Sequence, residues 1–152
     1  MNDKRVVAHL GVIRQSMRWV LRKEVESRVL IHTPTALREY LRLSHGSDRY
    51  EHVRAFYLDG RGRLLREEHF ERGTPSEAFV CLSHLIMRGM ELGSRIFMIV
   101  HNHPSGDPTP SDADKAFTRH IANVARELGM TLQDHLIVAE GSDFSFRQNG
   151  LL

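Results

Sequence analysis

Apolar residues recur at intervals of three and four along the first thirty residues, which is the spacing of one face of a helix. The pattern predicts an amphipathic helix over residues 5–29, with a stripe of arginines along its other side. The apolar positions are Val6, Leu10, Ile13, Met17, Val20 and Leu21. We interpret Met17 and its neighbour Trp19 as packing residues of this helix.

Shorter sequence patterns, which predict two further helices and a hairpin, follow the first predicted helix. Thr33-Pro34 has the form of an N-cap with proline at the first helical position, and it opens a predicted helix that runs to about Leu43. Two β-compatible runs flank the turn residues 59–62, which predicts an antiparallel hairpin. The Thr74–Glu77 stretch, TPSE, has the form of a capping box, so we predict a helix over residues 75–92.

The second half of the chain begins with the run RIFMIV at 95–100, which is almost wholly apolar and typical of a buried central strand. A helix at 113–128 and two closing strands at 135–139 and 144–148 complete the predicted elements. The order α, α, β-hairpin, α, β, α, β, β indicates a mixed α/β (α+β) domain with helices packed on one sheet.

Composition narrows the class of protein. The 152 residues are about the length of one domain, and no apolar window is long enough for a membrane span. The first thirty residues are rich in arginine and lack a signal-peptide core, so we expect a cytoplasmic protein. Cys81 is the only cysteine, which excludes an intrachain disulfide and a cysteine-rich zinc site. Any metal ligands must therefore be His, Asp or Glu.

Charge is spread unevenly, although the net charge is only +2. Residues 1–72 hold 15 Lys/Arg against 10 Asp/Glu, and residues 73–152 hold 6 against 9. A basic front half suits contact with nucleic acid or another acidic partner. A solvated surface that uses arginine gives the same pattern.

The stretch HNHPSGDPTPSDAD, residues 101–114, carries the candidate chemistry. Side chains two apart in a strand point the same way, so His101 and His103 can face one point. The turn that follows can bring Asp114 back beside them. Two imidazoles and a carboxylate form a three-ligand set for Zn²⁺ with a fourth position open to water. The alternative is structural, because Ser111-x-x-Asp114 is also an ordinary helix capping box.

These residues resemble the JAMM motif of the JAB/MPN metalloprotease fold, which has a cytidine-deaminase-like architecture. H-x-H-P is followed by S-x-x-D, with ten residues between His103 and Asp114. The longer string resembles the RadC-like branch of that family, and further matching stretches extend the resemblance over residues 33–152. Residues 1–32 then form a separate basic helix. The further matching stretches are YEHVRAFYLDGRGRLL, MELGSRIFMIVHNHPSG, DHLIV and SFRQNGLL.

The resemblance implies one Zn²⁺ per chain, held by His101, His103 and Asp114. It also implies that Ser111 donates a hydrogen bond to the tetrahedral intermediate. It also implies a glutamate that moves protons, and the spacing we assign to it falls on His84. Three alternatives follow: His84 acts as the base or as a fourth ligand, Glu77 acts as the base, or the site is impaired. Asp134-His135 is either an outer support for a zinc histidine or a turn followed by a surface histidine.

Two functions therefore compete. The first is a zinc-dependent hydrolase of amide or isopeptide bonds that acts on a peptide or isopeptide substrate. The second is a catalytically impaired, metal-binding JAB/MPN domain that binds DNA or protein. The DNA-repair association of the second reading comes from the resemblance to RadC-like proteins.

Overall fold

The computed structural model describes residues 3–27, 35–45, 50–71 and 82–152. The cap expected at Thr33-Pro34, the capping box at Thr74–Glu77 and Cys81 lie outside these residues.

The described residues form helices and strands in the order α, α, β, β, α, β, α, β, β, which confirms the predicted order. The elements are α1 (Asp3–Ser27), α2 (Thr35–His45), β1 (His52–Leu58), β2 (Leu64–Glu71), α3 (Leu82–Glu91), β3 (Ile96–Asn102), α4 (Asp112–Glu127), β4 (Thr131–Ala139) and β5 (Ser142–Ser145).

The strands form one mixed sheet in the order β2-β1-β3-β4-β5. β3 and β4 run parallel because α4 carries the chain back between them, and the other neighbours are antiparallel. β3 is the central strand, as its apolar run predicts, and Phe97 to Val100 are fully buried.

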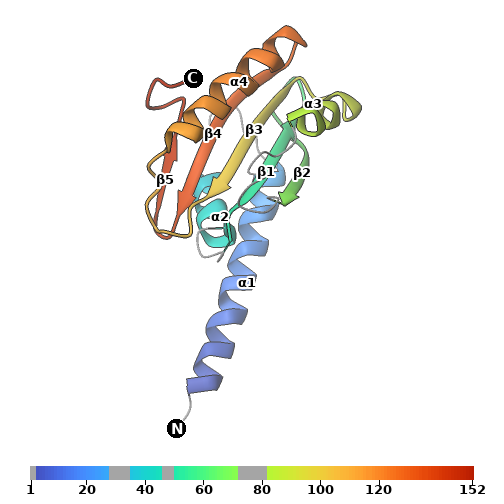
Figure 1. The fold of residues 1–152 in the computed structure, drawn as a ribbon. Coiled ribbons are helices and arrows are strands. Elements are labelled where there is room, and N and C mark those ends of the chain that lie inside the picture. The colour runs from blue at the N-terminus through green and yellow to red at the C-terminus, as the bar shows by residue number, and fades with distance from the viewer. Residues whose placement is uncertain (1–2, 28–34, 46–49, 72–81) are drawn as a thin grey trace.

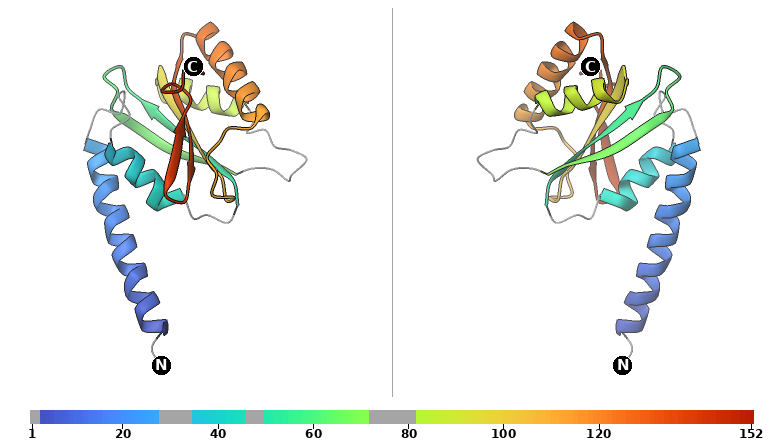
Figure 2. Two further views of the ribbon diagram at one scale, coloured as in Figure 1. Left: turned by 90° about the vertical axis from the view of Figure 1, so that its left-hand side faces the viewer. Right: turned by 90° about the vertical axis from the view of Figure 1, so that its right-hand side faces the viewer.

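Helices cover both faces of the sheet, so the mixed α/β prediction is confirmed (Figure 1). Alternate residues of β1 and β3 pack with α3 and α4 on one face, where Tyr57, Phe97 and Ile121 are buried. The residues between them pack with α2 and the end of α1 on the other face, around Phe56 and Met98. Figure 2 shows the sheet edge-on between these two layers.

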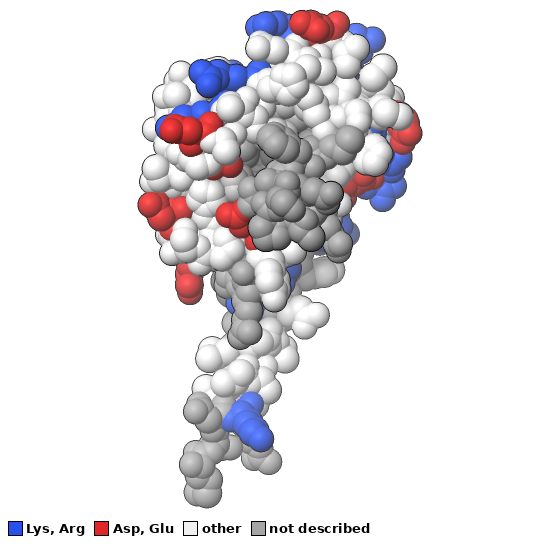
Figure 3. Space-filling view, in the orientation of Figure 1, with Lys and Arg blue, Asp and Glu red and all other residues white. Residues whose placement is uncertain are grey.

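The packing interpretation of α1 is wrong for most of its length. Met17 is 50% exposed and Trp19 63% exposed, because α1 extends away from the domain and only its last turns reach the core through Val25. On the face drawn in Figure 3 the projecting part is largely uncharged. Arg14 and Arg18 turn back and donate hydrogen bonds to main-chain carbonyls at the end of α2. Among the described helices, none is both long and apolar enough to cross a membrane.

Two strand boundaries differ from the prediction in ways that matter for function. β3 continues past residue 100, so His101 lies inside the sheet and pairs with Val53 and Ile137. β4 begins at Thr131, not at residue 135, and its register against β3 shifts at Gln133. Such a bulge changes which face the following side chains take. Leu132 and His135 consequently lie on the same face of the sheet, toward α4.

Two helical glycines offer a matched test of this packing. A Cβ on Gly89 of α3 would meet the end of Met130 and lie 3.2 Å from the Tyr57 ring, whereas one on Gly11 of α1 would meet nothing within 4 Å. We expect Gly89→Ala to lower the free energy of unfolding by about 1–3 kcal/mol through overpacking. Gly11→Ala should leave it unchanged or raise it by up to about 1 kcal/mol. Urea denaturation measures both, and equal effects would contradict the packing.

Candidate metal centre

The end of β3 presents two imidazoles on one face of the sheet. His101 is buried within β3, and His103 follows directly after the strand, where its amide donates to the Val138 carbonyl. Their rings meet edge to face, with centroids 4.6 Å apart. The alternation expected from the H-x-H spacing is therefore present.

Asp114 reaches both histidines from the first turn of α4. Its Oδ1 lies 3.7 Å from His101 Nδ1, and its Oδ2 lies 3.7 Å from His103 Nε2. Ser111 is the N-cap of α4 and forms a capping box with Asp114. The cap and the ligand interpretations of this pair are therefore compatible, because one carboxylate occupies both positions.

Hydrogen bonds fix the Asp114 carboxylate. Its Oδ2 accepts the Ser111 amide at 2.8 Å and the Ser111 hydroxyl at 2.5 Å. Burial by itself would raise the pKa of Asp114, but the contact with His103 and the hydrogen bonds from Ser111 outweigh it and hold the pKa below its ordinary value. The carboxylate is therefore ionised at neutral pH.

The tautomer of His103 suits a metal. Its Nδ1 lies 2.7 Å from the Asp107 carbonyl oxygen, which can only accept, so Nδ1 carries the proton. In the neutral ring the Nε2 lone pair then faces an ionised oxygen of Asp114 at 3.7 Å. The contact with Asp114 raises the pKa of His103, against the effect of burial.

The spacing of these atoms fits zinc. Tetrahedral ligands that lie about 2.0–2.1 Å from Zn²⁺ are about 3.3 Å from each other. The distance from His103 Nε2 to Asp114 Oδ2 is slightly wider, at 3.7 Å. A nitrogen-rich set with one carboxylate is also a set that zinc accepts. The residues present therefore fit the ion that the sequence resemblance implies.

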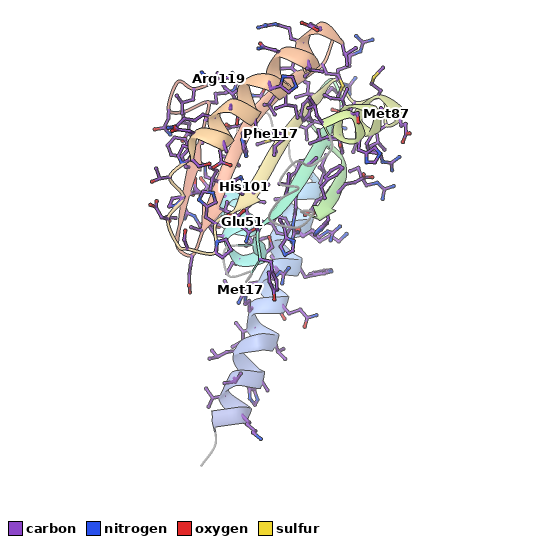
Figure 4. All side chains as sticks on the ribbon, viewed as in Figure 1. Met17, Glu51, Met87, His101, Phe117 and Arg119 are labelled. Atoms are coloured by element: carbon purple, nitrogen blue, oxygen red, sulfur yellow. The ribbon has the colours of Figure 1, made fainter. Side chains whose placement is uncertain are left out.

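A second carboxylate, which the sequence reasoning missed, lies at the same place. One oxygen of Glu51 and one ring nitrogen each of His101 and His103 all lie within 4.8 Å of one another. Figure 4 shows Glu51 and His101 beside each other at this end of the sheet. Since Val53 pairs with His101 in antiparallel register, Glu51 comes opposite His103 when that register is continued.

Asn102 holds the main chain on both sides of Glu51. Its side chain points to the opposite face from the histidines, where its Oδ1 accepts the His52 amide at 2.7 Å. Its Nδ2 donates to the Tyr50 carbonyl at 2.9 Å. The middle residue of the HNH stretch thus fixes the segment that carries the second carboxylate.

The other sequence candidates for the proton carrier lie elsewhere. His84 is exposed on α3 and does not belong to the Glu51, His101 and His103 group found within the described chain. Glu77 lies outside the described residues. Their catalytic roles stay predictions, and the second carboxylate that the structure brings to the histidines comes from the residue directly before β1. Only the pairing of β1 with β3 reveals it, because fifty residues separate Glu51 from His101.

His135 is a buried partner of the site, not a surface residue. Its Nε2 lies 3.4 Å from His101 Nδ1, and its Nδ1 lies 2.6 Å from the Thr118 hydroxyl. Burial, followed by the charge of His101, lowers the pKa of His135 to about 3. The ring is therefore neutral. Asp134 turns away and accepts the Ser145 hydroxyl at 2.6 Å.

A family model of the RadC-like JAB domain matches residues 31–151. The chain belongs to this family. The predicted resemblance is thus confirmed, and the histidines and Asp114 lie inside the matched JAB domain.

Relatives of this JAB domain protein are longer than the chain. It is 36% identical over 147 residues to UPF0758 proteins of Rhodobacter capsulatus and Ruegeria pomeroyi. It is 34% identical over 143 residues to one of Paracidovorax citrulli. These matches cover 97%, 97% and 94% of the chain but only 69%, 66% and 60% of the relatives.

The candidate ligands His101, His103 and Asp114 predict a defined metal content. We expect the purified protein to hold about one zinc per chain, and the double variant His101→Ala/His103→Ala to hold none, because two of the three expected ligands are removed. His84→Ala is the matched control and should keep its zinc. Elemental analysis after dialysis measures all three. A zinc-free parent, or loss of zinc in the His84 variant, would contradict the assignment.

Proposed function

We propose that this chain is a zinc-dependent hydrolase of amide or isopeptide bonds. The observation that carries the proposal is the position of Glu51, whose carboxylate oxygen lies within 4.8 Å of a ring nitrogen of both His101 and His103. Hydrolysis by a metal-activated water needs metal ligands, such as two histidines and a third residue, and a separate carboxylate that acts as the base.

His101, His103 and Asp114 would hold the ion, as their donor atoms and tautomers suit it. When bound, zinc supplies a Lewis acid that polarises the scissile carbonyl and lowers the pKa of water to about 7. The formal charges would also balance, because the carboxylates of Asp114 and Glu51 offset a divalent cation that two neutral imidazoles hold. This balance supports a resident ion at the site.

Glu51 is the proton carrier in this proposal. Its carboxylate takes a proton from the attacking water and returns it to the leaving amine. The position suits this task because Glu51 directly precedes β1, which pairs with β3, whereas Asp114 comes from α4. The Asn102 side chain holds the flanking main chain in place through Tyr50 and His52.

Ser111 is the proposed donor to the oxyanion of the tetrahedral intermediate. In the structure its hydroxyl donates to Asp114, so it lies at the edge of the centre. A rotation about its Cβ–Oγ bond would redirect that proton, while the hydrogen bond from the Ser111 amide to Asp114 persists. Membership of the JAB family and the metal geometry support a peptide or isopeptide as the substrate class.

The proton carrier is tested by comparing three variants. We expect Glu51→Gln to lower hydrolysis of fluorogenic peptide and lysine-isopeptide substrates by about 10²–10⁴-fold, because the base is lost. Its zinc content should not change if Glu51 is a base and not a ligand. His84→Gln and Glu77→Gln should retain activity, as should the exposed control Glu140→Gln.

Rate constants and zinc analysis on the same preparations decide between the candidates. Activity retained in the Glu51 variant but lost in the His84 or Glu77 variant would overturn the assignment. Loss of zinc in the Glu51 variant would make Glu51 a ligand and the site a closed one.

The alternative function is a catalytically impaired JAB domain that binds a partner. One observation favours it: apolar side chains such as Leu10, Ile13 and Trp19 are more than half exposed on α1. For a DNA partner, affinity for duplex DNA that falls steeply with salt concentration would support the alternative. Weak binding at all salt concentrations would argue against it.

A further inference from the structure

A chain of hydrogen bonds connects helix α4 to His101 through the buried core. Thr118 Oγ1 lies 2.6 Å from the Asp114 carbonyl oxygen and 2.6 Å from His135 Nδ1. His135 Nε2 in turn lies 3.4 Å from His101 Nδ1. Thr118 and His135 are almost fully buried, at 0% and 1% exposure, so water does not compete for these contacts.

The first contact fixes the direction of every bond in this chain. A main-chain carbonyl oxygen only accepts, so the single hydroxyl proton of Thr118 goes to the Asp114 carbonyl. Thr118 Oγ1 must then accept from His135, which places the proton of that neutral ring on Nδ1. His135 Nε2 is left with a lone pair, and the proton between the two rings must come from His101 Nδ1.

We propose that His135 is a positioning residue of the metal centre, which fixes His101 in the tautomer that leaves Nε2 free to bind the ion. The inference rests on the proposed metal centre. It adds a residue that supports the first ligand from behind, where metal-bound histidines usually have a carboxylate, carbonyl or water.

The core holds the His135 ring rigidly enough for this task. The ring stacks on Phe146, with centroids 4.7 Å apart and planes 10° from parallel. The edge of Phe117 approaches from α4 at 6.3 Å between centroids. The register shift at Gln133 turns His135 toward α4 and His101. A regular strand would send it to the opposite face.

A neutral acceptor has a chemical consequence. A carboxylate in this position would add a negative charge to a centre that already has Asp114 and Glu51, and it would make His101 a stronger base. The uncharged ring fixes the tautomer without either effect. A bound cation therefore keeps more of its positive charge for the substrate carbonyl.

Paired substitutions separate the two nitrogens of His135. The oxygen of a glutamine side chain can replace Nε2 as the acceptor for His101, whereas an asparagine reaches only the position of Nδ1. We expect His135→Gln to bind zinc within about threefold of the parent. His135→Asn should bind it about 10–100-fold more weakly, as for other lost outer partners of a metal ligand. Competition with a chromophoric chelator measures the affinities, and the exposed His120→Asn is the control.

Nitrogen-15 NMR of the metal-free parent at pH 8 tests the tautomers directly. We expect the proton on Nδ1 in both His101 and His135, and a mixture of tautomers in both rings of Thr118→Val. This measurement of the tautomers needs no metal and no folded His135 variant. A proton on Nε2 of His101 in the parent would overturn the proposal, as would equal zinc affinities of the Gln and Asn variants. A parent with the expected tautomers that binds no zinc would refute the metal centre but not the tautomer control.

Discussion

The position of β3 between an antiparallel and a parallel neighbour is the constraint on which the rest of the structure depends. Pairing with β1 brings Glu51 to the end of β3, and pairing with β4 brings His135 beside His101. The crossover that makes β3 and β4 parallel is α4, whose first turn returns Asp114 to the same place. A slip of one residue in the pairing with β1 would send Glu51 to the opposite face, and a slip in the pairing with β4 would do the same to His135.

Electrostatics explains why these groups are kept together despite burial. In a neutral His103 whose Nδ1 donates to the Asp107 carbonyl, the lone pair of Nε2 faces the ionised carboxylate of Asp114. The hydrogen bond to the Asp107 main chain fixes this arrangement. Burying such a pair is costly unless a cation or a proton lies between the two groups. A proton on His103 Nε2 or a cation between the two groups would each meet this requirement, and the contact with Asp114 raises the pKa of His103 accordingly.

The fourteen residues from His101 to Asp114 combine structural and chemical tasks. Alternation in the strand sends the histidines to one face and Asn102 to the other, where it anchors the chain around Glu51. At the far end, Ser111 caps α4 while Asp114 faces the imidazoles. The candidate ligands thereby lie at a strand end and a helix start, which are more rigid than a loop.

The sequence by itself determined the element order, the buried central strand, the family and the approach of His101, His103 and Asp114. These depend on local periods of two and 3.6 residues and on a short turn, which neighbouring residues specify. Only the tertiary structure decided that Glu51 lies beside the histidines, that His135 is buried behind His101 and that most apolar side chains of α1 are exposed. Strand pairing and a bulge create these contacts between residues far apart in the chain, and no local pattern encodes such a pairing.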